Sequence, residues 1–235
     1  MGYWWLGAKT YLRDRAPPKW LNKSECVAPE SIERYDEKYS GADRALSGLM
    51  TRPVFVLEER ERAPLAVRSL AATSLSERLE PCFLVSREFR TIIESIDPRA
   101  LVSADCDVRC HCREGVSGYV LADAALCVDA LTVLDRANSS ITIQVGFAHD
   151  DGRRTHAVDI AGPVRFALDA VSDRALFRVQ LGWMDSRLAV SGALAEAIFE
   201  SRFLGLCLND ATGRRIAPER FREYSTEGWE ELYPA

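Results

Sequence analysis

The sequence predicts an α+β fold, in which helices pack on a mostly antiparallel sheet. Two observations support this class. Short apolar runs bounded by turn-forming residues recur along the chain, which is typical of β-strands. Two of these runs end in a Val-Ser step that leads into an apolar stripe with helical spacing. A serine at such a step caps a helix, because its hydroxyl accepts otherwise unpaired amide hydrogens of the first turn. The chain therefore contains two units of strand, serine cap and helix.

The N-terminal part predicts strands separated by turns. Residues 1–12 are rich in β-formers and predict a strand whose Trp4 and Trp5 face opposite sides. Pro17-Pro18 ends this strand, since proline cannot continue a sheet interior. The elements expected after it are a short helix within residues 41–50, a strand over residues 53–57, and either a strand or a helix within residues 65–79.

The two units of strand, cap and helix follow at residues 82–98 and 188–208. In the first, Ser86 is the expected cap and Asp97-Pro98 ends the helix. In the second, Ser191 is the cap, and Gly205 suits a helix exit before a final strand. The apolar faces of the two helices are formed by Phe89, Ile92, Ile93 and Ile96, and by Leu194, Ala197, Ile198 and Phe199.

Between the two units the pattern predicts mainly strands. Ile141–Phe147 alternates as a half-buried strand does, and a polar turn at residues 149–152 leads into the strand Thr155–Ile160. A second pair joins residues 175–181 to residues 187–190 through Gly182. The other expectations are a strand beginning at residues 119–122, a helix or two strands carrying Leu126, Val128, Leu131 and Leu134, a turn at residues 135–140, and a short helix at residues 166–170.

The order of these motifs resembles the eleventh numbered family of bacterial immunity proteins in polymorphic toxin systems. The motifs are Phe83–Arg90, Gly118–Asp123, Val128–Asp135, Leu176–Arg178, Leu188–Ser191 and Leu204–Leu206. The resemblance spans residues 80–210. It implies a protein that neutralises a cognate protein toxin by stoichiometric occlusion, in competition between bacteria that includes type VI secretion. It implies no catalytic residue and no cofactor, and it leaves the toxin-binding residues unknown.

Length and charge set the expected organisation and partners. The 235 residues suit either one compact unit, or an N-terminal extension or subdomain at 1–63 followed by an immunity-protein-like α+β domain at 64–235. No stretch approaches the roughly 18 apolar residues of a membrane helix, and the N-terminus lacks the pattern of a secretory signal. We therefore expect a cytoplasmic protein. A net charge of −5 argues against nucleic acid as the partner and favours a basic one.

Seven cysteines are expected to be mostly thiols in a reducing cytoplasm. Cys82, Cys127 and Cys207 lie in apolar runs and are interpreted as core residues. The cluster of Cys106, Cys110, His111 and Cys112 offers a weak alternative, a metal site in a metal-thiol protein or small-molecule enzyme. Its spacing is unfavourable, because on a strand the histidine would point away from the two cysteines beside it. An exposed loop or strand with incidental thiols is therefore favoured over metal binding.

Polar candidates for catalysis are few. The histidines are His111, His149 and His156, and His149-Asp150-Asp151 could form a base with orienting carboxylates. A solvated hairpin turn explains that trio better. Arg178 and Asp123 are the best candidates for a specific role, yet a buried or half-buried salt bridge accounts for each more simply. Because no recognised nucleophile or phosphate-loop motif is present, the sequence predicts a binding protein and no enzyme.

Overall fold

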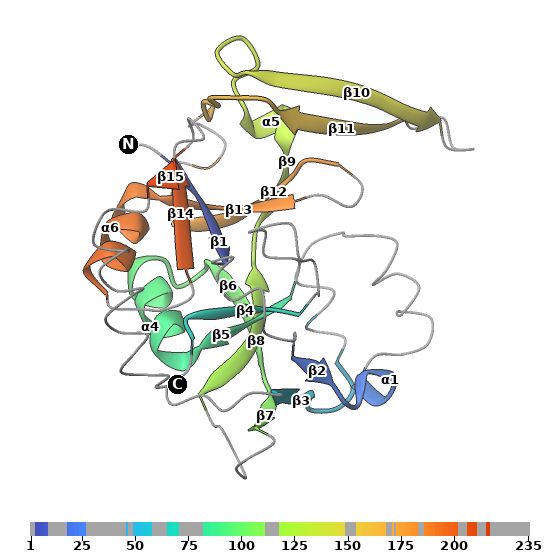
Figure 1. Ribbon diagram of the computed structural model, residues 1–235, viewed down its shortest axis with the longest axis vertical. Coiled ribbons are helices and arrows are strands. Elements are labelled where there is room, and N and C mark those ends of the chain that lie inside the picture. Colours follow the sequence, from blue (N-terminus) through green and yellow to red (C-terminus); the bar gives the residue numbers. More distant parts are fainter. Residues whose placement is uncertain are drawn as a thin grey trace, which may run out of the picture.

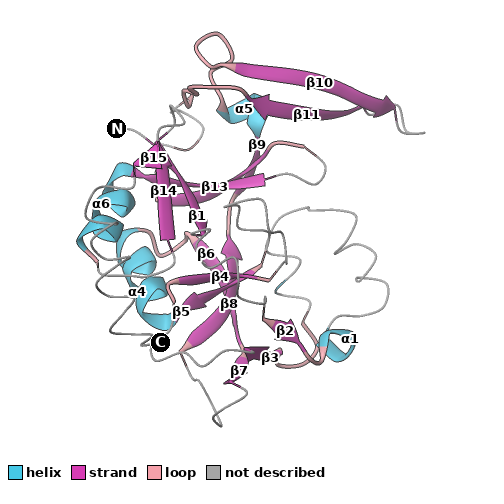
Figure 2. Ribbon diagram, viewed as in Figure 1, coloured by secondary structure: helices cyan, strands magenta, loops and turns pink. Residues whose placement is uncertain are grey.

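The computed structural model describes residues 3–8, 18–26, 46, 49–57, 65–70, 82–110, 118–148, 154–167, 171, 173–182, 186–201, 206–210 and 215–216. Their strands form four sheets in which most neighbours run antiparallel, and the helices are few and short (Figures 1 and 2). The predicted α+β class is confirmed.

The largest sheet has six strands and is built from both ends of the chain. Its spatial order is β15 (Arg215–Ile216), β14 (Leu206–Asp210), β1 (Tyr3–Ala8), β13 (Ser186–Ser191), β12 (Leu176–Gln180) and β9 (Cys127–Asp129). β1 thus lies between β13 and β14, antiparallel to both. A domain boundary at residue 63, one of the two organisations that the sequence suggested, would place β1 in a different unit from β13 and β14, with which it pairs.

Two smaller sheets form the lower part of the molecule in Figure 1. The four-stranded sheet has the order β4 (Val67–Ser69), β5 (Phe83–Ser86), β8 (Tyr119–Ala124) and β6 (Leu101–Asp105). The three-stranded sheet has the order β2 (Lys19–Trp20), β3 (Val54–Leu57) and β7 (Asp107–Cys110). The short helix α1 (Lys23–Cys26) follows β2. The predicted strands at residues 1–12 and 53–57 are confirmed by β1 and β3.

Both predicted serine caps are present. The hydroxyl of Ser86 accepts the Phe89 amide at 3.2 Å and begins α4 (Arg87–Ile96), which ends at Asp97. The hydroxyl of Ser191 accepts the Leu194 amide at 3.4 Å and begins α6 (Gly192–Glu200). That helix ends at Glu200, and Gly205, the expected exit, lies outside the described residues.

Replacing Ser86 by alanine is expected to lower the free energy of unfolding by about 1 kcal/mol, because the buried Phe89 amide loses its acceptor. Urea titration measures the loss. Ser95→Ala is the matched control, since Ser95 is an exposed serine near the opposite end of the same helix. A loss for Ser95→Ala equal to that for Ser86→Ala would contradict a capping role.

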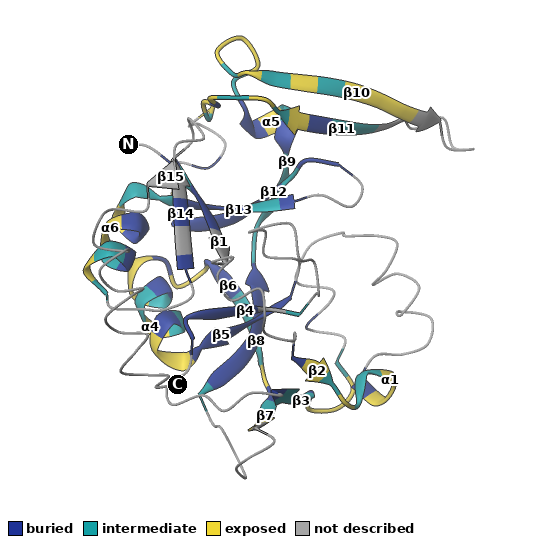
Figure 3. Ribbon diagram, in the orientation of Figure 1, coloured by how far each residue is buried: buried dark blue, intermediate teal, exposed yellow. Residues whose placement is uncertain are grey.

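The six-stranded and four-stranded sheets are buried on both faces, and they share one core. Helices α4 and α6 lie side by side against this core (Figure 3). This central core includes Phe89 and Ile93 of α4 and Leu194 and Ile198 of α6. The opposite face of the four-stranded sheet packs on the three-stranded sheet. The opposite face of the six-stranded sheet carries Trp5, while Trp4 packs on the central core as predicted. Burial on both faces explains the continuous apolar runs of β5 and β8.

The fourth sheet is the predicted hairpin, formed by β10 (Ile141–Ala148) and β11 (Arg154–Ile160). Before the hairpin, residues 126–134 include the strand β9 and the helical turn α5 (Ala130–Val133). The two predicted alternatives, one helix or two strands, are therefore each only partly correct. The predicted helix at residues 166–170 is wrong at its start, because Phe166 forms a β-bridge with Leu134. The pair at 175–181 and 187–190 is confirmed as β12 and β13.

Candidate functional site

The most buried polar group of the described chain is the pair of Arg178 and Asp123. Arg178 Nε donates to Asp123 Oδ1 at 3.0 Å, and Nη2 bonds the same oxygen. Arg178 Nη1 donates to Ser186 Oγ at 3.1 Å. The side chains of the pair are 3% and 5% exposed. The salt bridge predicted for each residue is confirmed, and the two residues are partners of each other.

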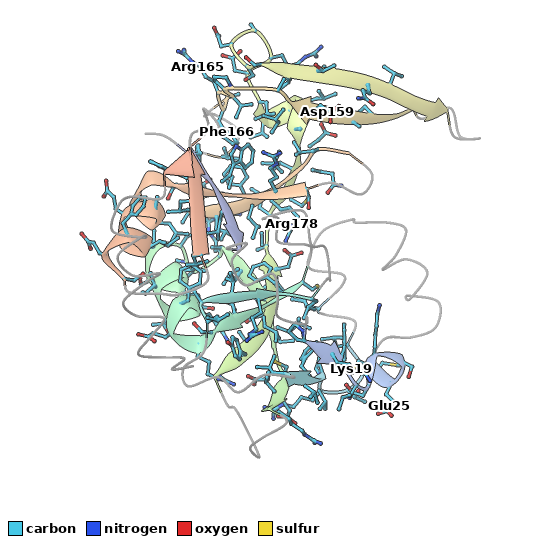
Figure 4. All side chains as sticks on the ribbon, in the orientation of Figure 1. Lys19, Glu25, Asp159, Arg165, Phe166 and Arg178 are labelled. Atoms are coloured by element: carbon cyan, nitrogen blue, oxygen red, sulfur yellow. The ribbon has the colours of Figure 1, made fainter. Side chains whose placement is uncertain are left out.

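This ion pair connects two sheets. Asp123 is in β8 of the four-stranded sheet, and Arg178 is in β12 of the six-stranded sheet, near the place where the chain passes from β8 to β9 (Figure 4). The Arg178 amide donates to the carbonyl of Leu126 in that passage. A pair so deeply buried cannot meet a macromolecular partner. Its role is to hold the sheets together, and the geometry assigns it no chemistry on a substrate.

The two candidate metal ligands in the described part of the chain, Cys106 and Cys110, are not brought together. Cys106 is buried next to the core of the three-stranded sheet, and its thiol donates to the Tyr119 carbonyl at 3.7 Å. Cys110 ends β7, and the extended residues 107–110 alone rise about 10 Å. Two thiolates on one zinc lie within about 5 Å of each other. His111 and Cys112 lie outside the described residues. No group of three or more potential ligands occurs in the part of the chain that the structure describes.

The interpretation of the cysteine segment as exposed is wrong for Cys106, which is 5% exposed. Parallel pairing of β7 with β3 carries this residue into the core, and that pairing joins segments far apart in sequence. Cys82 is buried as expected, and Cys127 is half-buried. The side chain of Cys207 lies outside the described residues. Burial raises the pKa of the Cys106 thiol to about 11 and also raises the pKa of Cys127.

The Cys106 thiol is therefore expected to resist alkylation. Thiolate is the reacting form, so a pKa of about 11 leaves far less of it at pH 8 than an ordinary thiol has, and iodoacetamide should react about 100-fold more slowly. Peptide mapping by mass spectrometry after timed labelling measures this rate. The same labelling in urea is the control, because unfolding exposes the thiol. Equal rates in the two conditions would contradict the burial of Cys106.

Of the histidines, His156 is the one in the described chain. Its Nε2 lies 3.0 Å from Asp129 Oδ2, and Asp129 also accepts the Leu131 amide at the start of α5. The partner of His156 in this pair is a carboxylate. The pair joins β11 of the hairpin to β9 of the large sheet. His149, Asp150 and Asp151 lie outside the described residues, so the predicted turn there stays a prediction.

The hairpin is anchored at its base and projects from the body (Figure 1). Ser139 Oγ accepts the Arg165 amide at 2.9 Å, and the Ser140 amide donates to the Pro163 carbonyl at 2.7 Å. Along β11, Gly182 comes so close that a Cβ on it would lie 3.2 Å from the Cβ of Ala157. Beyond this anchorage β10 lies on the outer side, and Val145 is 66% exposed. The hairpin was predicted from its alternation, whereas its exposed edge was not identified as a surface.

Comparison with known proteins identifies the family. A model described as Immunity protein family (Imm11) matches residues 10–213. This match extends the resemblance seen at residues 80–210 through most of the N-terminal part. No curated protein matches the chain significantly. No helix in the described ranges is long and apolar enough to span a membrane. Because the family model covers most of the 235 residues, the chain belongs to the Imm11 family of immunity proteins.

Proposed function

We propose that this protein neutralises a cognate bacterial toxin by binding it stoichiometrically and occluding its active site in the cytoplasm of the producing cell. The observation that carries the proposal is the family match over residues 10–213. The buried groups of the described chain also favour binding over catalysis. Arg178 and Asp123 are paired with each other inside the protein, and Cys106 is a core thiol.

Tight inhibition of this kind needs a protein interface of about 1,200–2,000 Å² with a few dominant contacts. The net charge of −5 favours a basic toxin, because opposite charges accelerate the encounter of two proteins. The proposed setting is competition between bacteria, with the toxin delivered by a route such as type VI secretion.

Co-expression tests the proposal. The chain is produced together with the toxin encoded beside it, and growth and copurification are measured. We expect growth to be restored and the two proteins to elute as one complex. The control expresses the same toxin with an unrelated acidic protein of similar size. If the toxin is active in that control and this chain neither restores growth nor copurifies, the proposal is wrong.

Titration separates occlusion from enzymatic inactivation. Purified toxin activity is measured against increasing amounts of the chain. Occlusion requires about one chain per toxin for full inhibition, and dissociation of the complex returns active toxin. Complete and lasting inactivation by a small fraction of an equivalent would instead indicate a catalytic antitoxin.

A further inference from the structure

The pairing of β10 with β11 shows which backbone N–H and C=O groups of β10 point toward its outer edge. In an antiparallel pair, directly opposed residues alternate between those that exchange hydrogen bonds and those that point their amides away from each other. The Val158 amide donates to the Leu181 carbonyl on the far side of β11, so it is not directed at β10. The pair of Ile143 and Val158 is therefore a pair without mutual hydrogen bonds.

The alternation then fixes the neighbouring positions. Thr142 and Gln144 direct their amides and carbonyls toward β11, while Ile143 and Val145 direct theirs outward. The Ala161 amide donates to the Ser140 carbonyl, which agrees with this phase. In the described part of the chain β10 has no strand partner besides β11. Its outer edge thus presents two N–H and two C=O groups in the spacing that an added strand requires.

The side chains of this edge do not protect it. Natural edge strands are usually blocked by charged residues, by proline, by a β-bulge or by a cover of other elements. The irregularity in the pairing of β10 lies between Val145 and Ala148, after the regular stretch from Ile141 to Val145. The sequence Ile141–Ala148 contains no charged residue and no proline. Figure 3 shows β10 as exposed or half-buried along its described side chains. Among the described large apolar residues Val145 has the highest exposed fraction, 66%, and Ile143 lies on the same face of the hairpin.

The two faces of the hairpin define the chemistry of a matching strand. Ile143 and Val145 share one face with Val158, whereas Gln144 lies on the other face and donates to the Asp159 carboxylate at 2.6 Å. Both Gln144 and Asp159 are exposed. An added strand would place apolar side chains beside Val145 and polar side chains beside Gln144 on the opposite face. It therefore alternates apolar residues with polar ones.

We propose that an extended segment of the cognate toxin, alternating apolar and polar residues, adds to the outer edge of β10 as a third strand of the hairpin sheet. The inference rests on the proposed function, since a family that acts on a protein partner makes the toxin the occupant. Main-chain hydrogen bonds to Ile143 and Val145 supply affinity, and the side-chain contacts with Val145 and Gln144 supply specificity. The hydrogen bonds of Ser139 and Ser140 at the base of the hairpin position this edge.

Two substitutions test the edge directly. Ile143→Pro removes one outward N–H and leaves the inward bonds of Thr142 and Gln144, which is the position that proline tolerates on an edge strand. Val145→Lys places a charge where an apolar contact is expected. Each is expected to weaken toxin binding by about 10-fold or more in calorimetry. Ala193→Lys, at an exposed position of α6, is the charge-matched control and should bind as the parent protein does.

The outcomes separate the inference from the function on which it rests. If the parent chain does not bind the toxin, the proposed function fails. If the parent chain binds and both folded variants bind equally well, the edge is not the contact and the inference is overturned. Thermal unfolding of Val145→Lys and Ile143→Pro checks that the fold persists. If sedimentation shows that the free chain dimerises and that Ile143→Pro abolishes the dimer, a second copy occupies the edge and the toxin assignment is wrong.

Discussion

Asp123→Ala is expected to lower the free energy of unfolding by about 3–5 kcal/mol, a large part of the stability of an ordinary domain. The substitution leaves the guanidinium of Arg178 in the protein interior without its carboxylate. The guanidinium also donates to the hydroxyl of Ser186, which is neutral and does not offset a buried charge. The effect extends across two sheets, because Asp123 belongs to the four-stranded sheet and Arg178 to the six-stranded sheet.

The matched control for Asp123→Ala is Asp105→Ala. Asp105 accepts from Arg87 at 2.9 Å, but its side chain is 65% exposed, so its removal is expected to cost about 1 kcal/mol or less. Urea unfolding of both variants gives the comparison. The double variant Asp123→Leu with Arg178→Met should recover much of the loss, since apolar replacement of a buried pair is often neutral. Equal losses for Asp123→Ala and Asp105→Ala would contradict the role of the buried pair.

Phe177→Ala is the second change with a large expected effect, again about 3–5 kcal/mol of unfolding free energy. Phe177 is fully buried in β12, and its ring meets those of Tyr3 and Phe166 edge-on, with centroids 5.2 Å and 5.9 Å away. The ring therefore connects the large sheet to the segment that anchors the hairpin. Its removal leaves a cavity where these parts join, and cavities in a packed core cannot collapse completely.

Phe199→Ala provides the comparison for Phe177→Ala. Phe199 is half-buried in α6, where it packs edge-on against Trp4 with a centroid distance of 5.8 Å. Because less of its surface leaves water on folding, a smaller loss is expected. Chemical unfolding followed by fluorescence and circular dichroism measures both variants. If Phe199→Ala lowered the free energy of unfolding as much as Phe177→Ala or more, the contacts of Phe177 with Tyr3 and Phe166 would not have the expected importance for the base of the hairpin.

The features that sequence predicted well depend on nearby residues. Ser86 and Ser191 cap helices because each hydroxyl meets an amide three positions ahead, and such a contact can be read from spacing alone. The β10–β11 hairpin is similar, since its two strands are separated by only a few residues in the sequence. Arg178 and Asp123 were singled out as polar residues in apolar surroundings. Their pairing was not predicted, because they are 55 residues apart and belong to different sheets.

The predictions that failed depend on distant segments. The apolar pattern of residues 126–134 fitted a helix or two strands. The structure of this segment was decided instead by the parallel pairing of β9 with β12. Phe166 bridges to Leu134 for a similar reason. Cys106 became a core residue through the alignment of β7 with β3. In each case local preference was weak, and long-range strand pairing determined the result.

The central position of β1 has a consequence for how the protein matures on the ribosome. Trp4 pairs with Val190 on one side and with Asp210 on the other, so β1 finds its neighbours only when nearly all of the chain has been made. At about 5–20 residues per second, this strand waits on the order of 10–40 s after its own synthesis. Pairings of such sequence separation also slow folding itself. The six-stranded sheet is therefore completed only at the end of synthesis, and until then the two tryptophans of β1 lack the strands that bury them.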